Sequence, residues 1–256
     1  MLASEIMVKP VTLVSVSITK TAKIVVFLPL SGLIFTVMWS ILFDLENSTA
    51  THCKVANYLP SVSAAIALTP QAYIWRFNIA LHSMPRYMLL LMYWEWHYKR
   101  TVDRSKLLAP LHGLLIILAV GANFVELSAL LGLTIISSTE SPGAHETSFI
   151  LFMIGSITCM ISSCLLNTTM VIETENEKKS KNIKLFAVVI HITSFISALY
   201  FYFRHNAKCE PGVYSLFALS EYIVIISNML FHYQHGLDFC AYKIQVNNNN
   251  DPQKIS

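Results

Sequence analysis

Long apolar runs alternate with short polar segments along the whole chain. Each apolar run holds about 20 residues or more, which is the length that a helix needs to cross a bilayer. The six predicted spans cover residues 24–43, 71–94, 107–136, 149–172, 185–203 and 213–233. The pattern therefore predicts an all-α, polytopic membrane bundle of six transmembrane helices.

The composition supports a membrane protein. Of the 256 residues, 54% are hydrophobic and 13% are charged, whereas a typical soluble domain has about 25% charged residues. The chain does not open on a short apolar run with a small-residue cleavage site, so we expect no removed signal peptide.

Basic residues concentrate in alternate polar segments and predict the orientation of the bundle. The N-terminus, the second and fourth connections and the tail hold Lys9, Lys20, Lys23, Lys99, Arg100, Arg104, Lys106, Lys178, Lys179, Lys181, Lys184, Lys243 and Lys254. The other three connections hold only Lys54, Arg204 and Lys208. Because basic residues favour the cytosolic side, both termini are expected to be cytosolic.

This orientation divides the chain into three parts. They are a cytosolic N-terminal segment (1–23), a six-span transmembrane domain (24–233) with lumenal loops at 44–70, 137–148 and 204–212, and a cytosolic tail (234–256). The tail contains a run of asparagines and is expected to be disordered.

The lumenal loops contain a candidate disulfide and a candidate glycosylation site. Cys53 and Cys209 lie in different loops on the oxidising side, where a disulfide can persist. Asn47 begins an Asn-Ser-Thr sequon on the same side, close to the end of the first span.

The second span carries ionisable residues at membrane depth. An arginine near a bilayer centre costs between about 3 and more than 10 kcal/mol, so such residues usually face a protein interior or a wet cavity. His82 and Arg86 are four residues apart and so lie on one face of the helix. We therefore expect a polar site inside the bundle.

Two other spans bring acids to a similar depth. Counting from the lumenal ends of the spans at about 1.5 Å per residue places His82, Glu126 and Glu221 roughly 13 to 17 Å below the surface. Asn123 lies one turn from Glu126. The groups could form a site for a polar headgroup or for proton transfer, or a structural network in which Arg86 neutralises Glu126 or Glu221.

Further polar residues gather near the lumenal surface: His52, His145, Glu146, Arg204, His205 and Glu210. The spacing of His205 and Glu210 is faintly like the histidine-acid pair of glycerolipid acyltransferases. Arg76 and Arg204 could bind a lipid phosphate, although Arg76 could instead extend to the membrane surface.

Other sequence signals are weaker. His232 and His235 share a helix face at the cytosolic end of the sixth span, where the simplest interpretation is an interfacial polar cap. No phosphate-binding glycine loop, nucleophile elbow or zinc-ligand spacing occurs, and no metal site is predicted.

Several short runs together resemble one family. They are Thr51-His52-Cys53, residues 57–63, Trp75-Arg76-Phe77, Leu81-His82-Ser83, Pro85-Arg86, Asn123, Glu126, Ser137-Ser138, His145-Glu146, residues 203–206, Cys209-Glu210, residues 212–214, Glu221-Tyr222, Asn228, Met229, Phe231 and His232. With these runs the chain resembles the post-GPI attachment to proteins factor 2 family, within the wider group of DRAM-type and Sfk-type six-span membrane proteins.

The resemblance implies a function in the lipid remodelling of GPI anchors in the Golgi membrane, with the endoplasmic reticulum as a second location. The implied reaction is reacylation of lyso-GPI-anchored proteins at sn-2 with a saturated chain taken from acyl-CoA or a phospholipid, without a cofactor. The alternative is a non-catalytic lipid-binding or escort factor. The implied partners are GPI-anchored proteins with their lyso-GPI lipid, the membrane and a protein of the same pathway, and no nucleic acid.

A mechanism can be written for the implied reaction. His82, or His52 or His205 if the site lies at the surface, takes the proton from the sn-2 hydroxyl, while Glu126 or Glu221 orients that histidine. The residues expected to bind substrate are Arg76, Arg86, Asn123, His145 and Arg204.

Overall fold

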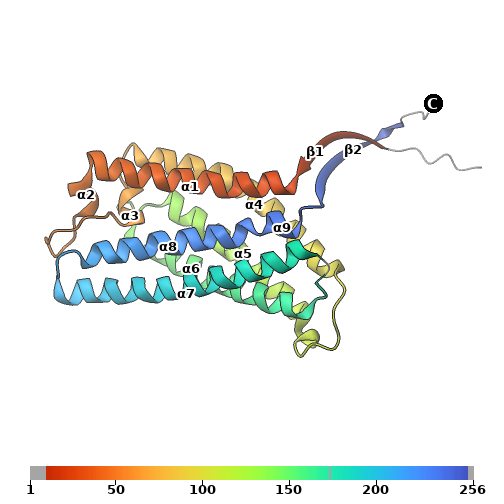
Figure 1. The fold of residues 1–256 in the computed structure, drawn as a ribbon. Helices are drawn as coiled ribbons and strands as arrows, with labels where there is room; N and C mark the ends of the chain where they lie inside the picture. The colour runs from red at the N-terminus through yellow and green to blue at the C-terminus, as the bar shows by residue number, and fades with distance from the viewer. Residues whose placement is uncertain (1–9, 173, 253–256) are drawn as a thin grey trace, which may run out of the picture.

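The computed structural model describes residues 10–172 and 174–252 as an elongated bundle of helices (Figure 1). Residues 1–9 and 253–256 of the expected N-terminal segment and tail lie outside the described residues. The long helices are α1 (Ile18–Phe43), α4 (Gln71–Lys99), α5 (His112–Ile135), α6 (Pro142–Thr169), α7 (Glu175–Lys208) and α8 (Val213–Tyr233). The short helical turns are α2 (Leu45–Thr49), α3 (Val62–Ala65), the 3-10 turn η1 (Ala109–Leu111) and α9 (His235–Asp238).

The six long helices form a closed ring. Going round it, α1 packs on α4, α4 on α5, α5 on α6, α6 on α7, α7 on α8, and α8 on α1. Glycine allows a close approach of α5 and α6, because a Cβ added at Gly155 of α6 would lie 2.8 Å from the backbone nitrogen of Glu126 on α5. Large side chains such as Phe27 (66% exposed) and Leu91 (71% exposed) face outward, as expected for a surface that contacts lipid.

Five helical segments are long and apolar enough to cross a membrane by length and composition. They are Ile18–Phe43, Ala109–Ile135, Pro142–Thr169, Glu175–Lys208 and Val213–Asp238. The chain is thus a polytopic helical membrane protein. The expected second span, α4, has 29 residues but falls outside this set, because polar residues such as His82 and Arg86 interrupt its apolar run.

Three helices begin earlier than the hydrophobic pattern predicted. α1 begins at Ile18 rather than near residue 24, α6 at Pro142 rather than near residue 149, and α7 at Glu175 rather than near residue 185. At the start of α7 the Thr174 side chain accepts a hydrogen bond from the Glu177 backbone nitrogen at 3.2 Å, which is a helix N-cap. Hydrophobicity marks the part of a helix that suits a membrane, whereas caps mark its ends.

Part of the chain assigned to the tail forms a strand in the structure. The strand β2 (Lys243–Pro252) pairs antiparallel with β1 (Pro10–Ser17), and the pair projects from one end of the bundle (Figure 1). The asparagine run suggested disorder, but Ile244 and Val246 alternate with polar residues before it, as is typical of a strand. We call this end of the bundle the strand end.

The opposite end, which we call the loop end, is covered by the chain between α1 and α4 (Figure 1). The backbone nitrogens of Tyr58 and Leu59 donate to Ser215 Oγ of α8 at 2.7 and 3.3 Å. A disulfide joins Cys53 to Cys209, with the two Cα atoms 5.2 Å apart. These contacts hold the α1–α4 connection against α7 and α8.

Candidate functional site

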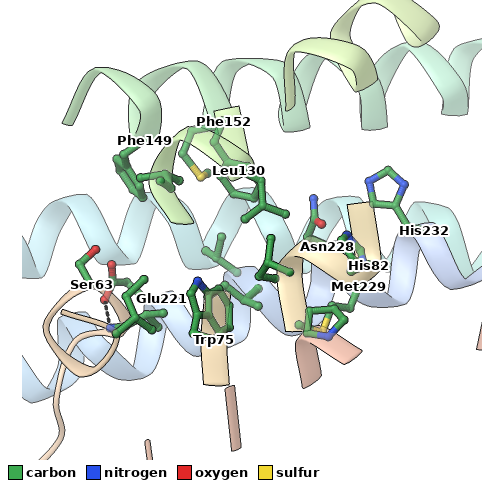
Figure 2. Close-up of a pocket in the computed structure, with 18 of the residues that line it drawn as sticks. Ser63, Trp75, His82, Leu130, Phe149, Phe152, Glu221, Asn228, Met229 and His232 are labelled. Atoms are coloured by element: carbon green, nitrogen blue, oxygen red, sulfur yellow. Dashed lines mark hydrogen bonds between the residues drawn. The ribbon is translucent and has the colours of Figure 1, made fainter. Parts of the chain in front are cut away.

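A cavity lies inside the ring of helices. Its walls bound about 970 Å³ of space, part of which is open to solvent. All six long helices and the α3 region contribute to its walls. The middle is apolar, with Trp75, Leu130 and Phe152 among the lining residues, whereas polar residues lie at both ends (Figure 2).

At the strand end of the cavity, buried polar side chains bind one another. Arg86 Nη2 lies 2.6 Å from Glu126 Oε1, and Asn228 Nδ2 donates to the same oxygen at 2.9 Å. His232 Nε2 lies 3.0 and 3.2 Å from the two Glu126 oxygens. Asn228 also donates to Ser156 Oγ at 2.9 Å. We call Arg86, Glu126, Ser156, Asn228 and His232 the strand-end cluster.

The carboxylate of Glu126 is the centre of this cluster. Its side chain is 0% exposed and that of Arg86 is 5% exposed. A buried carboxylate keeps its charge only where an opposite charge and hydrogen-bond donors compensate for the lost water. Glu126 does not line the cavity, whereas Arg86, Asn228 and His232 do. The carboxylate therefore holds these three lining side chains in position without lining the cavity itself.

His82 belongs to the same end of the cavity but not to the cluster. Its Nδ1 lies 2.6 Å from the backbone oxygen of Val25, so this nitrogen carries the proton and donates. Its Nε2 has no hydrogen-bond partner within the described part of the chain. Glu126, which was expected to orient His82, instead contacts His232. The structure therefore gives His82 a different orienting partner, the α1 backbone.

At the loop end, a serine and a histidine form a pair that lines the cavity. Ser63 Oγ lies 3.0 Å from His145 Nε2, and His145 Nδ1 lies 2.7 Å from the backbone oxygen of Ile136. Because the carbonyl can only accept, Nδ1 carries the proton and the serine hydroxyl donates to Nε2. Glu221 lies at this end as well (Figure 2), and its Oε2 accepts from the Val62 nitrogen at 3.1 Å.

The expected common depth of the three ionisable groups is wrong. Asn228 and His232 of α8 contact Glu126, whereas Glu221 lies seven residues before Asn228, about 10 Å along the helix. Glu126 is nine residues from the end of α5, but Asn228 is fifteen residues from the start of α8. Because Glu126 and Asn228 are in contact, α8 extends about six residues, or about 9 Å, farther toward the loop end than α5 does. Counting residues from the loops therefore gave the wrong depth for Glu221.

The two arginines expected to bind phosphate each contact a carboxylate. Arg76 Nη2 lies 3.0 Å from Glu140 Oε2, and Arg204 Nε lies 2.6 Å from Glu210 Oε2. The Ser137 backbone N–H, followed by the Arg76 guanidinium, lowers the pKa of Glu140. The hydrogen bond from Arg204 lowers the pKa of Glu210. A carboxylate therefore balances the charge of each arginine in this structure.

The remaining predicted residues lie outside the cavity walls. His205 Nε2 lies 3.0 Å from Thr51 Oγ1 and Glu210 contacts Arg204, so the supposed histidine-acid pair does not form.

The other predicted residues outside the cavity walls differ in exposure. His52 is exposed. Asn123 is buried, and its Oδ1 has no partner within the described residues. Asn47 is exposed in α2, with its Nδ2 2.9 Å from Asp44 Oδ1.

Sequence reasoning missed three residues that the structure brings to the cavity. His232 was interpreted as an interfacial cap, but it is 3% exposed and contacts Glu126. Asn228 and His232 are four residues apart and so lie on one face of α8, a spacing that could have indicated their shared contact with Glu126. Ser63 lies in the four-residue helix α3, which is too short for a periodic spacing to identify it.

Most of the chain matches a known protein family. Residues 22–242 match the family described as Frag1/DRAM/Sfk1/Cwh43P N-terminal domain. The chain belongs to this family. The match includes all of the cavity-lining residues, so the site described above lies within the family domain.

Curated relatives cover most of the chain. "Post-GPI attachment to proteins factor 2" of Drosophila pseudoobscura pseudoobscura is 43% identical over 85% of this chain and 84% of its own length. "Acyltransferase PGAP2" of Xenopus tropicalis is 39% identical over 89% of this chain and 90% of its own length. The Caenorhabditis elegans post-GPI attachment to proteins factor 2 is 40% identical, over 83% and 81%. No solved structure gives a significant match to the chain.

Proposed function

We propose that this protein remodels GPI anchors by reacylating lyso-GPI-anchored proteins at sn-2 with a saturated chain. The observation that carries this proposal is the cavity, because its apolar middle suits an acyl chain and its polar ends suit reacting or headgroup oxygens. The names of the relatives, a post-GPI attachment factor and an acyltransferase, support the same reaction class. The acyl donor would be acyl-CoA or a phospholipid.

The proposal includes a six-span topology in which α4 is the second span. Its outward face carries Phe77, Met84 and Leu91, exposed by 64%, 69% and 71%, whereas its polar residues His82 and Arg86 are buried. Such a helix can cross a bilayer, because its charged side chains face the protein rather than lipid. Mean apolarity along a helix does not distinguish these two faces.

Six spans would place both termini in the cytosol and the loop end in the lumen, by the distribution of basic residues. The disulfide between Cys53 and Cys209 at the loop end supports this orientation, because disulfides persist in oxidising compartments. The lumenal leaflet of the Golgi membrane, or of the endoplasmic reticulum, would then supply the lyso-GPI lipid to the loop end.

The chemistry requires a base for the sn-2 hydroxyl within the cavity. Three histidines line it. His82 at the strand end and His145 at the loop end each have an Nε2 that can accept a proton, whereas the Nε2 of His232 contacts Glu126. Transfer of a proton to a positioned histidine contributes about 10²- to 10⁴-fold in rate. The other candidate bases, His52 and His205, do not line the cavity, and we assign them no part in the reaction.

An escort that binds lyso-GPI without turnover is the second candidate. It is favoured by the ion pair of Arg86 with Glu126, which uses buried charges that contact the cavity wall for structure rather than for chemistry. Substitutions that keep the fold separate the two functions. An acyltransferase loses turnover but keeps lyso-lipid binding, whereas an escort loses both together.

The test is reacylation of a lyso-GPI substrate by the purified chain in nanodiscs, with saturated acyl donors and mass spectrometry of the product. We expect product from the wild type. Loss of product in His82→Ala with lipid binding retained would place the base at the strand end, and normal product would place it at the loop end. The matched control is Ser197→Ala, at a partly exposed serine whose hydroxyl donates to the backbone of its own helix. Lyso-lipid binding without product would overturn the acyltransferase and favour the escort.

A further inference from the structure

Ser63 and His145 have the geometry of a nucleophile and its base. The hydroxyl of Ser63 lies 3.0 Å from His145 Nε2, within the 2.6 to 3.2 Å range expected for such a pair. The Ile136 carbonyl holds the other ring nitrogen at 2.7 Å and so fixes the tautomer in which Nε2 can accept a proton. His145 is 6% exposed.

The segment that carries Ser63 is held in place by α8. Val62 donates its backbone N–H to Glu221 Oε2 at 3.1 Å, and Tyr214 donates its hydroxyl to Ser61 Oγ at 3.2 Å. The Tyr222 hydroxyl donates to the backbone oxygen of Pro60. These contacts precede Ser63 directly in the chain, so the position of its hydroxyl is set by the body of the bundle.

The surroundings of the pair suit a lipid carbonyl rather than water. Ser63 and His145 line the cavity together with Ile66, Leu133 and Phe149, which are apolar. An acyl chain lying in the apolar middle would bring its carbonyl carbon to one polar end. At the loop end that carbon would meet the serine oxygen, and at the strand end it would meet only imidazole nitrogens, an amide and a guanidinium.

We propose that Ser63 carries the acyl group between the donor and lyso-GPI, with His145 as its base. This inference rests on the proposed reacylation and adds a covalent intermediate to it. Nucleophilic catalysis of this kind splits one difficult transfer into two easier ones.

The two steps balance in atoms and protons. In the first, Ser63 Oγ attacks the carbonyl carbon of a thioester or ester donor and its proton moves to His145 Nε2. The bond between the carbonyl carbon and the donor's sulfur or oxygen breaks, and the leaving group takes that proton. In the second, the sn-2 hydroxyl oxygen attacks the acyl-serine carbonyl. Its proton passes through His145 Nε2 to Ser63 Oγ as the ester bond to the serine breaks.

The first experiment tests the nucleophile without the GPI substrate. The full chain in nanodiscs is treated with a long-chain alkyl fluorophosphonate, which reacts with activated serines, and the modified peptide is identified by mass spectrometry. We expect modification at Ser63 and none in Ser63→Ala. In His145→Gln, whose amide oxygen can still accept the serine hydrogen bond, labelling should slow by about 100-fold or more, because the base is lost. Ser197→Ala should label as the wild type does.

The second experiment uses the saturated acyl donor with no lyso-GPI present. We expect an acyl adduct on the peptide containing Ser63, in the wild type and in the control Ser197→Ala, that disappears when lyso-GPI is added. The inference is overturned if the wild type reacylates lyso-GPI while Ser63→Ala does so at the same rate, a result that leaves the proposed function standing. A folded wild type that yields neither adduct nor product overturns both.

Discussion

The two polar ends of the cavity differ in what their side chains contact. At the strand end, Arg86, Asn228 and His232 all surround the single carboxylate of Glu126. At the loop end, Ser63 donates to a histidine that is itself held by a backbone carbonyl, and no ion pair is involved. One end is a charged network that joins three helices, and the other is a neutral pair open to the cavity.

This difference indicates which buried polar residues stabilise the fold and which can take part in a reaction. A charge that is fully surrounded by partners contributes to the arrangement of helices, and removing it leaves its partner uncompensated. A neutral hydroxyl on an imidazole contributes little to stability, about 0.5 to 1.5 kcal/mol, but it can start a reaction. Stability should therefore depend on the strand end, and turnover on the loop end.

The largest effect on stability is expected from Glu126→Ala. This change leaves the buried guanidinium of Arg86 without a counter-charge, which costs about 3 to 5 kcal/mol. Unfolding can be followed in nanodiscs by the rate at which a thiol reagent labels Cys159, which is buried in α6. The matched control is Glu126→Leu combined with Arg86→Met, which removes both charges and should recover most of the lost stability. Equal losses in the control and the single variant would contradict an ion-pair role.

A smaller loss is expected where α5 and α6 meet behind the strand-end cluster. In Gly155→Ala, the new Cβ would lie 2.8 Å from the Glu126 nitrogen and 2.9 Å from the Ala122 oxygen, so the two helices must separate. Overpacking of this kind costs about 1 to 3 kcal/mol, and the same thiol assay measures it.

Gly121→Ala is the matched control for this substitution. Gly121 lies on α5, where an added Cβ would meet nothing within 4 Å. It should be neutral or stabilising by up to about 1 kcal/mol, because alanine favours a helix more than glycine does. A similar loss in both variants would show that close packing of α5 against α6 is not the cause.

The fold was largely predictable from the sequence because lipid imposes a simple pattern on helices. The spans around α5, α6 and α8 were identified by apolar length alone. α4 was also identified correctly as a helix, although its polar residues make it less apolar than the five segments that qualify as membrane spans. The starts of α1, α6 and α7 were not identified, because polar residues extend these helices beyond their apolar part.

The site was predictable only in part, because most of its contacts depend on how the helices are arranged. The pairing of Arg86 with Glu126 was one of two partners foreseen, because a buried charge needs an opposite one. Glu221 was misplaced, because its depth depended on the unknown relative heights of α5 and α8. Ser63 was not found, because a hydroxyl in a single short helical turn becomes chemically distinct only when the fold brings His145 to it.

The loop end should tolerate loss of its serine. Ser63→Ala removes one hydrogen bond to His145 and should cost only about 0.5 to 1.5 kcal/mol. Thermal unfolding should be close to that of the wild type, although the reacylation assay should lose its product. If Ser63→Ala instead unfolds as readily as Glu126→Ala, the pair is part of the structural framework and the contrast between the two ends fails.

The smallest effect is expected at the exposed ion pair of Arg76 with Glu140, beyond the loop end of the cavity. The Ser137 N–H and Arg76 lower the pKa of Glu140 below its ordinary value of 4.5. A carboxylate with a lowered pKa in the folded state stabilises the fold above the ordinary pKa, and this contribution is lost as the pH falls through the lowered value. Glu140→Gln should therefore unfold slightly more easily than the wild type from about pH 5 to 7, and equally at lower pH. Melting temperatures of the two proteins across this range measure the difference. A difference that persists in acid would mean that Glu140 acts through hydrogen bonds that do not need its charge.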